Sequence, residues 1–333
     1  MKNVTRSHVI TMNKVTRQFR TRLLHLDATS KARNDGHPLV SVVMPVYNSE
    51  AYVSDAIKSI VNQTYQNLEL VIVDDASTDN SWKIISVFAK RFPKKIRAIR
   101  LRKNLNKGGD TCANVGFAKA RGIYLARMDA DDISDRERIE KQVKFLQKNP
   151  DMLMVGTQAY VINAAGAVTG IKNVPTTYED IYKNYAVFHP MIHPTVMFNK
   201  KLLPKRKVIY KIKYSANNDL YTFFEFLNLG KFANLTEKLL YYRVHGANDS
   251  LTKPKERFFN TLRIRIDAIC NHDYRPTLKS ILVNLLQTGA ILVLPEKLIV
   301  PVYLYMKGIT RPTVNPQNTP FSTTLNKAAI TVS

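Results

Sequence analysis

The chain has 333 residues, of which 45% are hydrophobic and 23% are charged, values that exclude a globally disordered protein. Its formal net charge of +24 predicts an anionic partner, which is a nucleic acid, an anionic membrane or a phosphorylated substrate. The two cysteines, Cys112 and Cys270, lack metal-ligand spacing and are expected to be reduced, which suits a cytoplasmic protein.

The chain begins with a basic arm, residues 1–37, that carries no candidate catalytic group. Basic side chains interrupt the arm throughout, so it contains no continuous apolar segment. A secretory signal is therefore not expected. The arm ends in the loop sequence Asn34-Asp35-Gly36-His37-Pro38.

Strands and helices alternate from residue 39 to residue 128. The predicted strands are Leu39–Met44, Leu68–Val73, Ile96–Leu101 and Ile123–Met128, and helices separate them. The first strand is apolar almost without interruption, as expected for a strand that is buried on both faces. Alternation with short connections predicts an α/β domain with a mostly parallel open sheet, right-handed crossovers and flanking helices.

Three of these strands run into loops with distinctive side chains: Pro45-Val46-Tyr47, Asp74-Asp75 and Asp129-Ala130-Asp131-Asp132. Ligands of parallel sheets bind beyond the carboxyl ends of the strands, so the three loops should share one rim. The clustered carboxylates repel one another unless a cation neutralises them. Mg²⁺ or Mn²⁺ would suit such oxygen ligands, and an exposed acidic turn before a helix is the alternative.

With Asn114-Val115-Gly116, these motifs resemble the family 2 glycosyltransferases, which are inverting enzymes with the GT-A fold. Asn218-Asp219-Leu220 and Tyr241-Tyr242-Arg243-Val244-His245 are similar to the acceptor-side acid and the closing segment of that family. The resemblance covers about Leu39 to Leu251. It implies a Rossmann-like GT-A domain at residues 38–252. Its nucleotide-sugar half would be residues 38–135 and its acceptor half residues 136–252.

The resemblance also implies roles for individual residues. Asp131 and His245 would bind Mn²⁺ or Mg²⁺, which neutralises the diphosphate leaving group of a sugar nucleotide. The nucleotide-sugar itself would be bound by Pro45, Tyr47, Asp75, Asp129 and Arg243. In this set, Asp75 would accept a hydrogen bond from the base. A carboxylate suits the imide N–H of uracil, so UDP is the preferred nucleotide.

Inversion by a single displacement requires a base beside the acceptor hydroxyl, and the candidate is Asp219. The alternative role for Asp219 is a structural acid at a helix N-terminus, stabilised by the helix dipole. The family usually has an acid at the preceding position, where this chain has Asn218, and the change alters the local field of the base. His193 is either part of the acceptor site or structural, and the structural role is favoured.

Residues 253–310 are a basic and apolar helical extension, and residues 311–333 form a tail that is expected to be disordered. Two interpretations of the extension remain open. It is either a pair of core-packing helices broken at Pro295 and Pro301, or one or two amphipathic helices that lie in an anionic membrane interface. The net charge favours the membrane.

The predicted function is the transfer of one sugar from a UDP-sugar to a growing surface glycan, such as lipopolysaccharide or capsule, or to a lipid-linked oligosaccharide. The enzyme would be peripheral on the cytoplasmic face of the cell membrane. The sole tryptophan is Trp82, so the Gln-x-x-Arg-Trp motif of processive synthases is absent. A Mg²⁺-dependent phosphotransfer module is the alternative, although it leaves the Asp-x-Asp pattern unexplained. No nucleic-acid-binding motif supports a nucleic acid as partner.

Overall fold

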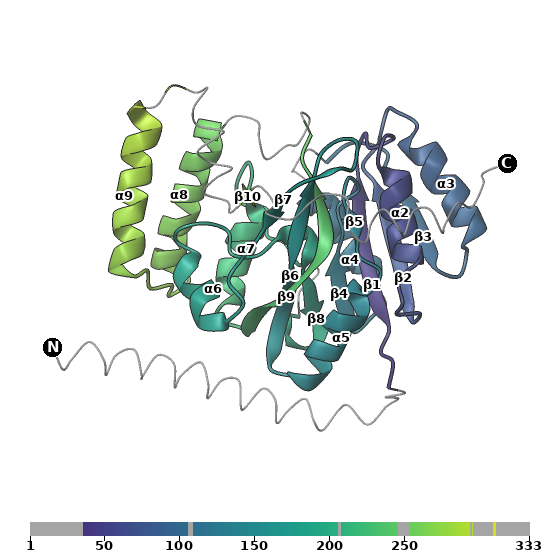
Figure 1. The fold of residues 1–333 in the computed structure, drawn as a ribbon, viewed down its shortest axis with the longest axis horizontal. Helices are drawn as coiled ribbons and strands as arrows, with labels where there is room; N and C mark the ends of the chain where they lie inside the picture. Colours follow the sequence, from purple (N-terminus) through teal and green to yellow (C-terminus); the bar gives the residue numbers. More distant parts are fainter. Residues whose placement is uncertain are drawn as a thin grey trace.

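The structure is a computed structural model that describes residues 36–105, 109–205, 208–245, 254–293, 295 and 309–310. Almost all of the predicted basic arm and the whole predicted tail lie outside the described residues, as do most positions between 294 and 308. In the described part, helices flank one ten-stranded sheet, and a pair of helices extends from one end (Figure 1).

The first half of the sheet is parallel, as predicted. It consists of β1 (Val40–Val46), β2 (Leu68–Asp74), β3 (Ile96–Arg100) and β4 (Tyr124–Arg127), in the order β4-β1-β2-β3. All residues of β1 and β2 are buried, which confirms the prediction of a strand covered on both faces. Because these strands point the same way, their carboxyl ends meet at one edge of the sheet.

Three helices connect these strands: α2 (Val53–Val61), α3 (Ser81–Arg91) and α4 (Asp110–Lys119). The apolar side chains of α2 recur at helical spacing and are all buried, so this helix packs on the sheet as its pattern predicts. Helix α3 is less buried, because its Ile85 is covered whereas Val87 is 57% exposed.

The second half of the sheet is mixed. Its elements are β5 (Ile133–Ser134), α5 (Arg138–Lys148), β6 (Met152–Ile162), β7 (Val168–Lys172), α6 (Tyr178–Asn184), β8 (Met197–Asn199), α7 (Asn218–Phe226), β9 (Lys231–Arg243) and β10 (Ile309–Thr310). Strand β8 lies antiparallel between β4 and β6, and β6 pairs with β9 in parallel. Parallel ladders hold most of the paired residues, and the fold is an α/β fold of the GT-A type, as the resemblance implied.

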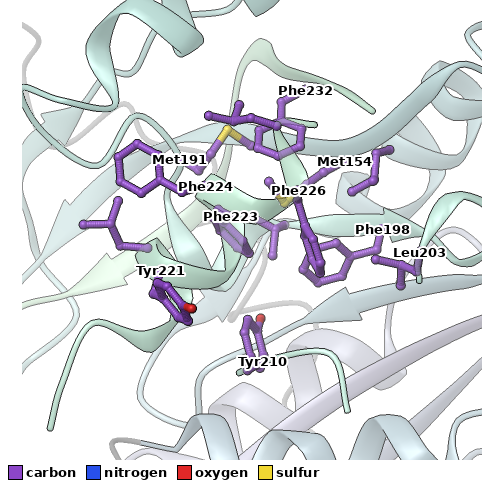
Figure 2. Packing of buried hydrophobic residues seen from close by; sticks show 14 of the residues in the cluster. Met154, Met191, Phe198, Leu203, Tyr210, Tyr221, Phe223, Phe224, Phe226 and Phe232 are labelled. Atoms are coloured by element: carbon purple, nitrogen blue, oxygen red, sulfur yellow. The ribbon is translucent and has the colours of Figure 1, made fainter. Parts of the chain in front are cut away.

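Aromatic side chains fill the core around α7 (Figure 2). Phe223, Phe224 and Phe226 of α7 are fully buried, together with Phe198 of β8 and Phe232 of β9. Burial of one such side chain contributes about 1.5–3 kcal/mol relative to exposure in water. The cluster therefore anchors α7 firmly, and the first turn of α7 is where Asp219 lies.

The extension contains α8 (Pro254–Asn271) and α9 (Leu278–Val293). Ile264 and Ala268 of α8 are fully buried and belong to the core cluster, so this helix packs on the domain. Two hydrogen bonds with Tyr182 help to hold the turn after α8: the Tyr274 hydroxyl donates to the Tyr182 carbonyl at 2.8 Å, and the backbone N–H of Arg275 donates to the Tyr182 hydroxyl at 3.0 Å. Across the described residues, no helix combines the length and apolarity needed to cross a bilayer.

Candidate functional site

The carboxyl ends of β4, β1 and β2 lie next to one another and carry the three predicted loops. The backbone N–H of Asp75 donates to the carbonyl of Val46 at 2.8 Å, which joins the loop after β2 to the end of β1. Pro45 is buried at that end, whereas Tyr47, just beyond it, is 51% exposed. The predicted rim is confirmed, and Tyr47 presents a free aromatic surface on it.

Asp75 is a buried carboxylate on this rim. Its Oδ1 accepts the backbone N–H of Leu105 at 2.9 Å. Burial raises the pKa of Asp75, and the charge of Asp74 raises it further, although the hydrogen bond from Leu105 opposes the change. A hydrogen-bond donor supplied by a ligand would stabilise the ionised form of this buried carboxyl group.

Asp131 and His245, the two predicted metal ligands, lie side by side. Nε2 of His245 is 3.1 Å from Oδ2 of Asp131, and both side chains are partly exposed to solvent. Burial raises the pKa of Asp131, and repulsion from Asp129 adds to the effect. A bound cation would relieve that repulsion.

Arg243 ties the end of β9 to the acidic loop. Its Nε donates to the carbonyl of Asp131 at 2.7 Å. Its Nη1 donates to the carbonyls of Asn163 and Ala164 at 3.1 and 2.9 Å. Its backbone N–H donates to Oδ1 of the buried Asp132 at 2.7 Å. The contact of Arg243 with a diphosphate stays a prediction. In the structure, Arg243 holds the Asp131 backbone in place.

Tyr52, at the start of α2, completes this corner. The guanidinium carbon of Arg243 lies 4.6 Å from the centre of the Tyr52 ring, which is a cation–π contact. The rings of Tyr52 and His245 are 5.0 Å apart between centroids. An aromatic side chain thus supports both the arginine and the histidine of the closing segment, a role that the sequence did not indicate.

The donor set at this corner fits a hard divalent cation. Carboxylate oxygens of Asp129 and Asp131 and an imidazole nitrogen of His245 suit Mg²⁺ and, better, Mn²⁺. Among the described residues, no three His, Cys, Asp or Glu side chains come close enough together to hold a metal ion on their own. That arrangement matches sites in which one or two protein ligands are completed by the phosphates of a substrate.

Two histidines flank Asp219. Its Oδ2 lies 3.2 Å from Nε2 of His189 and 3.5 Å from Nδ1 of His193. Burial alone would raise the pKa of Asp219, but the two imidazoles outweigh it, and the pKa lies well below its ordinary value. Asp219 is therefore an ionised carboxylate, which is the form that accepts a proton.

The protonation of His193 follows from its neighbours. Burial lowers the pKa of His193 from 6.5 to about 4, so the ring is neutral near pH 7. Ionised Asp219 can only accept a hydrogen bond, so the proton of His193 belongs on Nδ1. The other ring nitrogen, Nε2, then accepts the Tyr210 hydroxyl, 2.7 Å away. His193 thus lies between the Tyr210 hydroxyl, at hydrogen-bond distance from Nε2, and the carboxylate of Asp219, 3.5 Å from Nδ1.

A charged network joins Asp219 to the acidic rim. Arg127, at the end of β4, donates from Nε to Oδ1 of Asp129 at 2.9 Å. Its Nη1 lies 4.0 Å from Oδ1 of Asp110, which is also 4.0 Å from Nε2 of His193. Burial raises the pKa of Asp110 well above its ordinary value, and the charge of Asp219 raises it further. The pKa values of the two carboxyl groups are therefore shifted in opposite directions, upward for Asp110 and downward for Asp219.

Asn114, the first residue of the Asn114-Val115-Gly116 motif, has a structural role. Its Oδ1 accepts the backbone N–H groups of Ile209 and Tyr210 at 3.0 and 2.9 Å. Its Nδ2 donates to the carbonyl of Tyr210 at 2.8 Å. Asn114 thereby fixes the segment that places the Tyr210 hydroxyl against His193.

Sequence reasoning assigned no role to several members of this site, which are Tyr52, Asp110, Arg127, His189 and Tyr210. A signal existed for two of them. Arg127 is a charged residue at the end of a buried strand, and buried charges require partners. His189 and His193 recur four residues apart, each before a proline. Asp110 and Tyr210 carry no such signal, because only the fold brings them to Asp219.

Comparisons with known proteins identify the family and the fold. The family model described as Glycosyl transferase family 2 matches residues 41–206. An uncharacterised glycosyltransferase of Haemophilus influenzae is 33% identical over 240 residues, which cover 70% of this chain and 73% of that protein.

Solved structures share the fold at lower identity. The crystal structure of S. aureus TarS 1-349 in complex with UDP-GlcNAc is 20% identical with a TM-score of 0.56, and the match covers 74% of this chain and 70% of TarS. The mannosyltransferase PcManGT of Pyrobaculum calidifontis, in complex with GDP-Man and Mn²⁺, is 16% identical with a TM-score of 0.53. That match covers 89% of this chain and 82% of PcManGT.

Proposed function

This chain belongs to glycosyl transferase family 2, and from that premise we propose that it transfers a single sugar from a UDP-sugar to a hydroxyl group of a growing glycan, with inversion. The observation that carries the proposal is the ionised Asp219, which two histidines hold and which the Arg127–Asp110 network joins to the acidic rim. A base and a donor site are thus parts of one connected site.

The reaction is a single displacement. As the acceptor oxygen forms its bond to the anomeric carbon, Asp219 takes the hydroxyl proton, and the bond from that carbon to the diphosphate oxygen breaks. The nucleoside diphosphate leaves with the electron pair of the broken bond. Asp219 suits the role because its pKa is lowered and the group is ionised, whereas burial raises the pKa of Asp110.

Asp131 and His245 would hold the metal, with Asp129 beside them. When bound, Mn²⁺ or Mg²⁺ would neutralise the negative charge that develops on the leaving diphosphate. Arg243 keeps the Asp131 backbone in position, since it donates to the Asp131 carbonyl at 2.7 Å. Support for a metal comes from PcManGT, which shares the fold and was solved with Mn²⁺.

Asp75, Tyr47 and Pro45 form the proposed site for the base. The buried carboxyl of Asp75 would accept the imide N–H of uracil, and the exposed ring of Tyr47 would stack nearby. TarS, solved with UDP-GlcNAc, supports a uridine nucleotide, whereas PcManGT, solved with GDP-Man, supports a nucleotide sugar more generally. The chain belongs to glycosyl transferase family 2, and no observation favours the phosphotransfer alternative.

We place the enzyme on the cytoplasmic face of the cell membrane, where a lipid-linked oligosaccharide or another growing surface glycan, such as lipopolysaccharide or capsule, would be its acceptor. The net charge of +24 supports an anionic membrane surface as partner.

A thermal-shift screen of UDP, GDP, dTDP and CDP, each with and without Mn²⁺, tests the proposal. UDP with Mn²⁺ should raise the melting temperature most, because a ligand that binds only the folded state stabilises it. If none of the four nucleotides gives a metal-dependent shift, the proposed donor site is wrong.

A further inference from the structure

Helix α9 turns its polar side chains toward the protein. Ser280 is 1% exposed. Asn284 donates to the carbonyl of Ala186 at 2.5 Å and accepts from Arg265 of α8 at 2.7 Å. These contacts hold α9 against the domain through hydrogen bonds, where an ordinary surface helix would pack through apolar side chains.

The outer face of α9 is apolar. It consists of Leu278, Ile281, Leu282, Leu285, Leu286, Leu292 and Val293, whose exposed fractions range from 45% to 86%. Helix α8 exposes two further apolar side chains, Ile266 and Ile269, with 53% and 45% exposed. In Figure 1, α9 is the outermost helix at one end of the molecule. An exposed apolar surface of this kind marks a binding site for another apolar surface.

The charges around this face indicate which surface. Lys279 is the only charged residue of α9, so the helix carries no acid. Arg263 and Arg275 are exposed nearby in the sequence, along with the acids Glu256 and Asp273. An apolar helix face without acids, on a chain of net charge +24, suits a layer that is apolar inside and anionic at its surface.

We propose that the outer face of α9 lies in the interfacial layer of an anionic lipid bilayer, with the helix axis parallel to the membrane plane. The helix has 16 residues, a length of about 24 Å, whereas a span needs about 20 apolar residues. A second copy of the chain is the less favourable occupant, because two molecules with a charge of +24 repel each other. The inference rests on the proposed function in one respect, which is that the sugar acceptor is found at a membrane.

Vesicle co-sedimentation of the full chain tests this inference. The vesicles contain phosphatidylcholine mixed with phosphatidylglycerol, and phosphatidylcholine alone serves as the uncharged reference. The wild type should sediment with the anionic vesicles. The double variant Leu282→Gln, Leu285→Gln should bind at least about tenfold more weakly, because two apolar side chains that would be buried in the bilayer are replaced by polar ones.

The matched control is Val87→Gln, since Val87 is 57% exposed on α3, at the other end of the molecule (Figure 1). This control should bind vesicles like the wild type. A second variant, Leu286→Trp, should show a blue-shifted emission with anionic vesicles relative to the wild type, whose sole tryptophan is Trp82.

Three results would overturn the inference. The wild type could fail to bind anionic vesicles, the glutamine double variant could bind as well as the wild type, or sedimentation could show a dimer that the double variant dissociates. UDP-dependent thermal shifts of each variant are measured in parallel. An unchanged UDP shift with lost vesicle binding separates the membrane face from the donor site.

Discussion

Nδ1 of His193 lies 3.5 Å from the carboxylate of Asp219, while Nε2 of the same ring lies 2.7 Å from the hydroxyl of Tyr210. Because His193 is neutral, it can donate from only one nitrogen. The tyrosine hydroxyl occupies Nε2 as a donor and so keeps the proton on Nδ1, facing the proposed base.

Asp219→Asn should lower kcat by about 10²–10⁴, because an amide cannot accept the acceptor proton. Binding of UDP with Mn²⁺ should stay within about twofold of the wild type, since we propose that Asp219 acts on the acceptor and not on the nucleotide. Donor turnover and calorimetric UDP binding measure the two effects. Asp55→Asn, an exposed acid in the first turn of α2, is the matched control. Weaker UDP binding with full turnover would remove Asp219 as the base.

Tyr210→Phe should reduce kcat about tenfold and leave the KM for the donor unchanged, because Nε2 of His193 loses the hydroxyl that orients the ring, and with it Nδ1, toward Asp219. The control is Tyr185→Phe. The Tyr185 hydroxyl is buried without a hydrogen bond among the described residues, so its loss should cost no activity. Steady-state kinetics compares the two variants. Equal activity of Tyr210→Phe and the wild type would contradict the role of Tyr210 in orienting His193.

Acid should destabilise the wild type through His193. Its pKa is about 4 in the folded protein and 6.5 ordinarily, so between these values the unfolded chain binds a proton that the folded chain does not. Stability therefore falls as the pH falls from 6.5 to 4, by about 3 kcal/mol from this group. His193→Gln removes this contribution. Urea unfolding of both proteins across that pH range measures the difference, and parallel stability curves would disprove the assignment.

Asp131→Asn should abolish the dependence of UDP affinity on Mn²⁺, because an amide is a poorer ligand for a hard cation than a carboxylate. Affinity without metal should change little. Asp151→Asn is the control. Asp151 lies just before the start of β6, whereas Arg243 of the proposed site contacts Asn163 just after the end of β6, and Asp151 pairs with Lys231 at 3.2 Å. Calorimetric titration with and without Mn²⁺ measures both variants. If the UDP affinity of Asp131→Asn depends on Mn²⁺ as strongly as that of the wild type, Asp131 is not a metal ligand.

Gly122→Ala should destabilise the fold by about 1–3 kcal/mol. A Cβ at this position would lie 2.6 Å from the backbone nitrogen of Ser41 and 2.7 Å from the carbonyl oxygen of Leu39, and these backbone atoms in and just before β1 cannot move aside cheaply. Gly289→Ala on α9 is the control, because nothing lies within 4 Å of its Cβ and alanine favours the helix. Thermal unfolding should show a lower melting temperature only for Gly122→Ala.

The sequence by itself determined the elements and the rim. Apolar runs of strand length are local properties, so β1 and β2 could be predicted to within two residues at each end. The parallel arrangement follows from alternation, and it places Pro45, Asp75 and Asp129 along one edge of the sheet.

Only the tertiary structure decided how the site is completed. Asp110, Tyr210 and Asp219 come from separate segments, and no spacing in the sequence predicts that a helix start, a loop and a second helix meet around one imidazole. The face that α9 turns outward is also decided by the tertiary structure. Its leucines fit either a core or a membrane by composition, and hydrogen bonds through Asn284 turn them away from the protein. Such choices depend on which partners the rest of the fold supplies, so local sequence cannot make them.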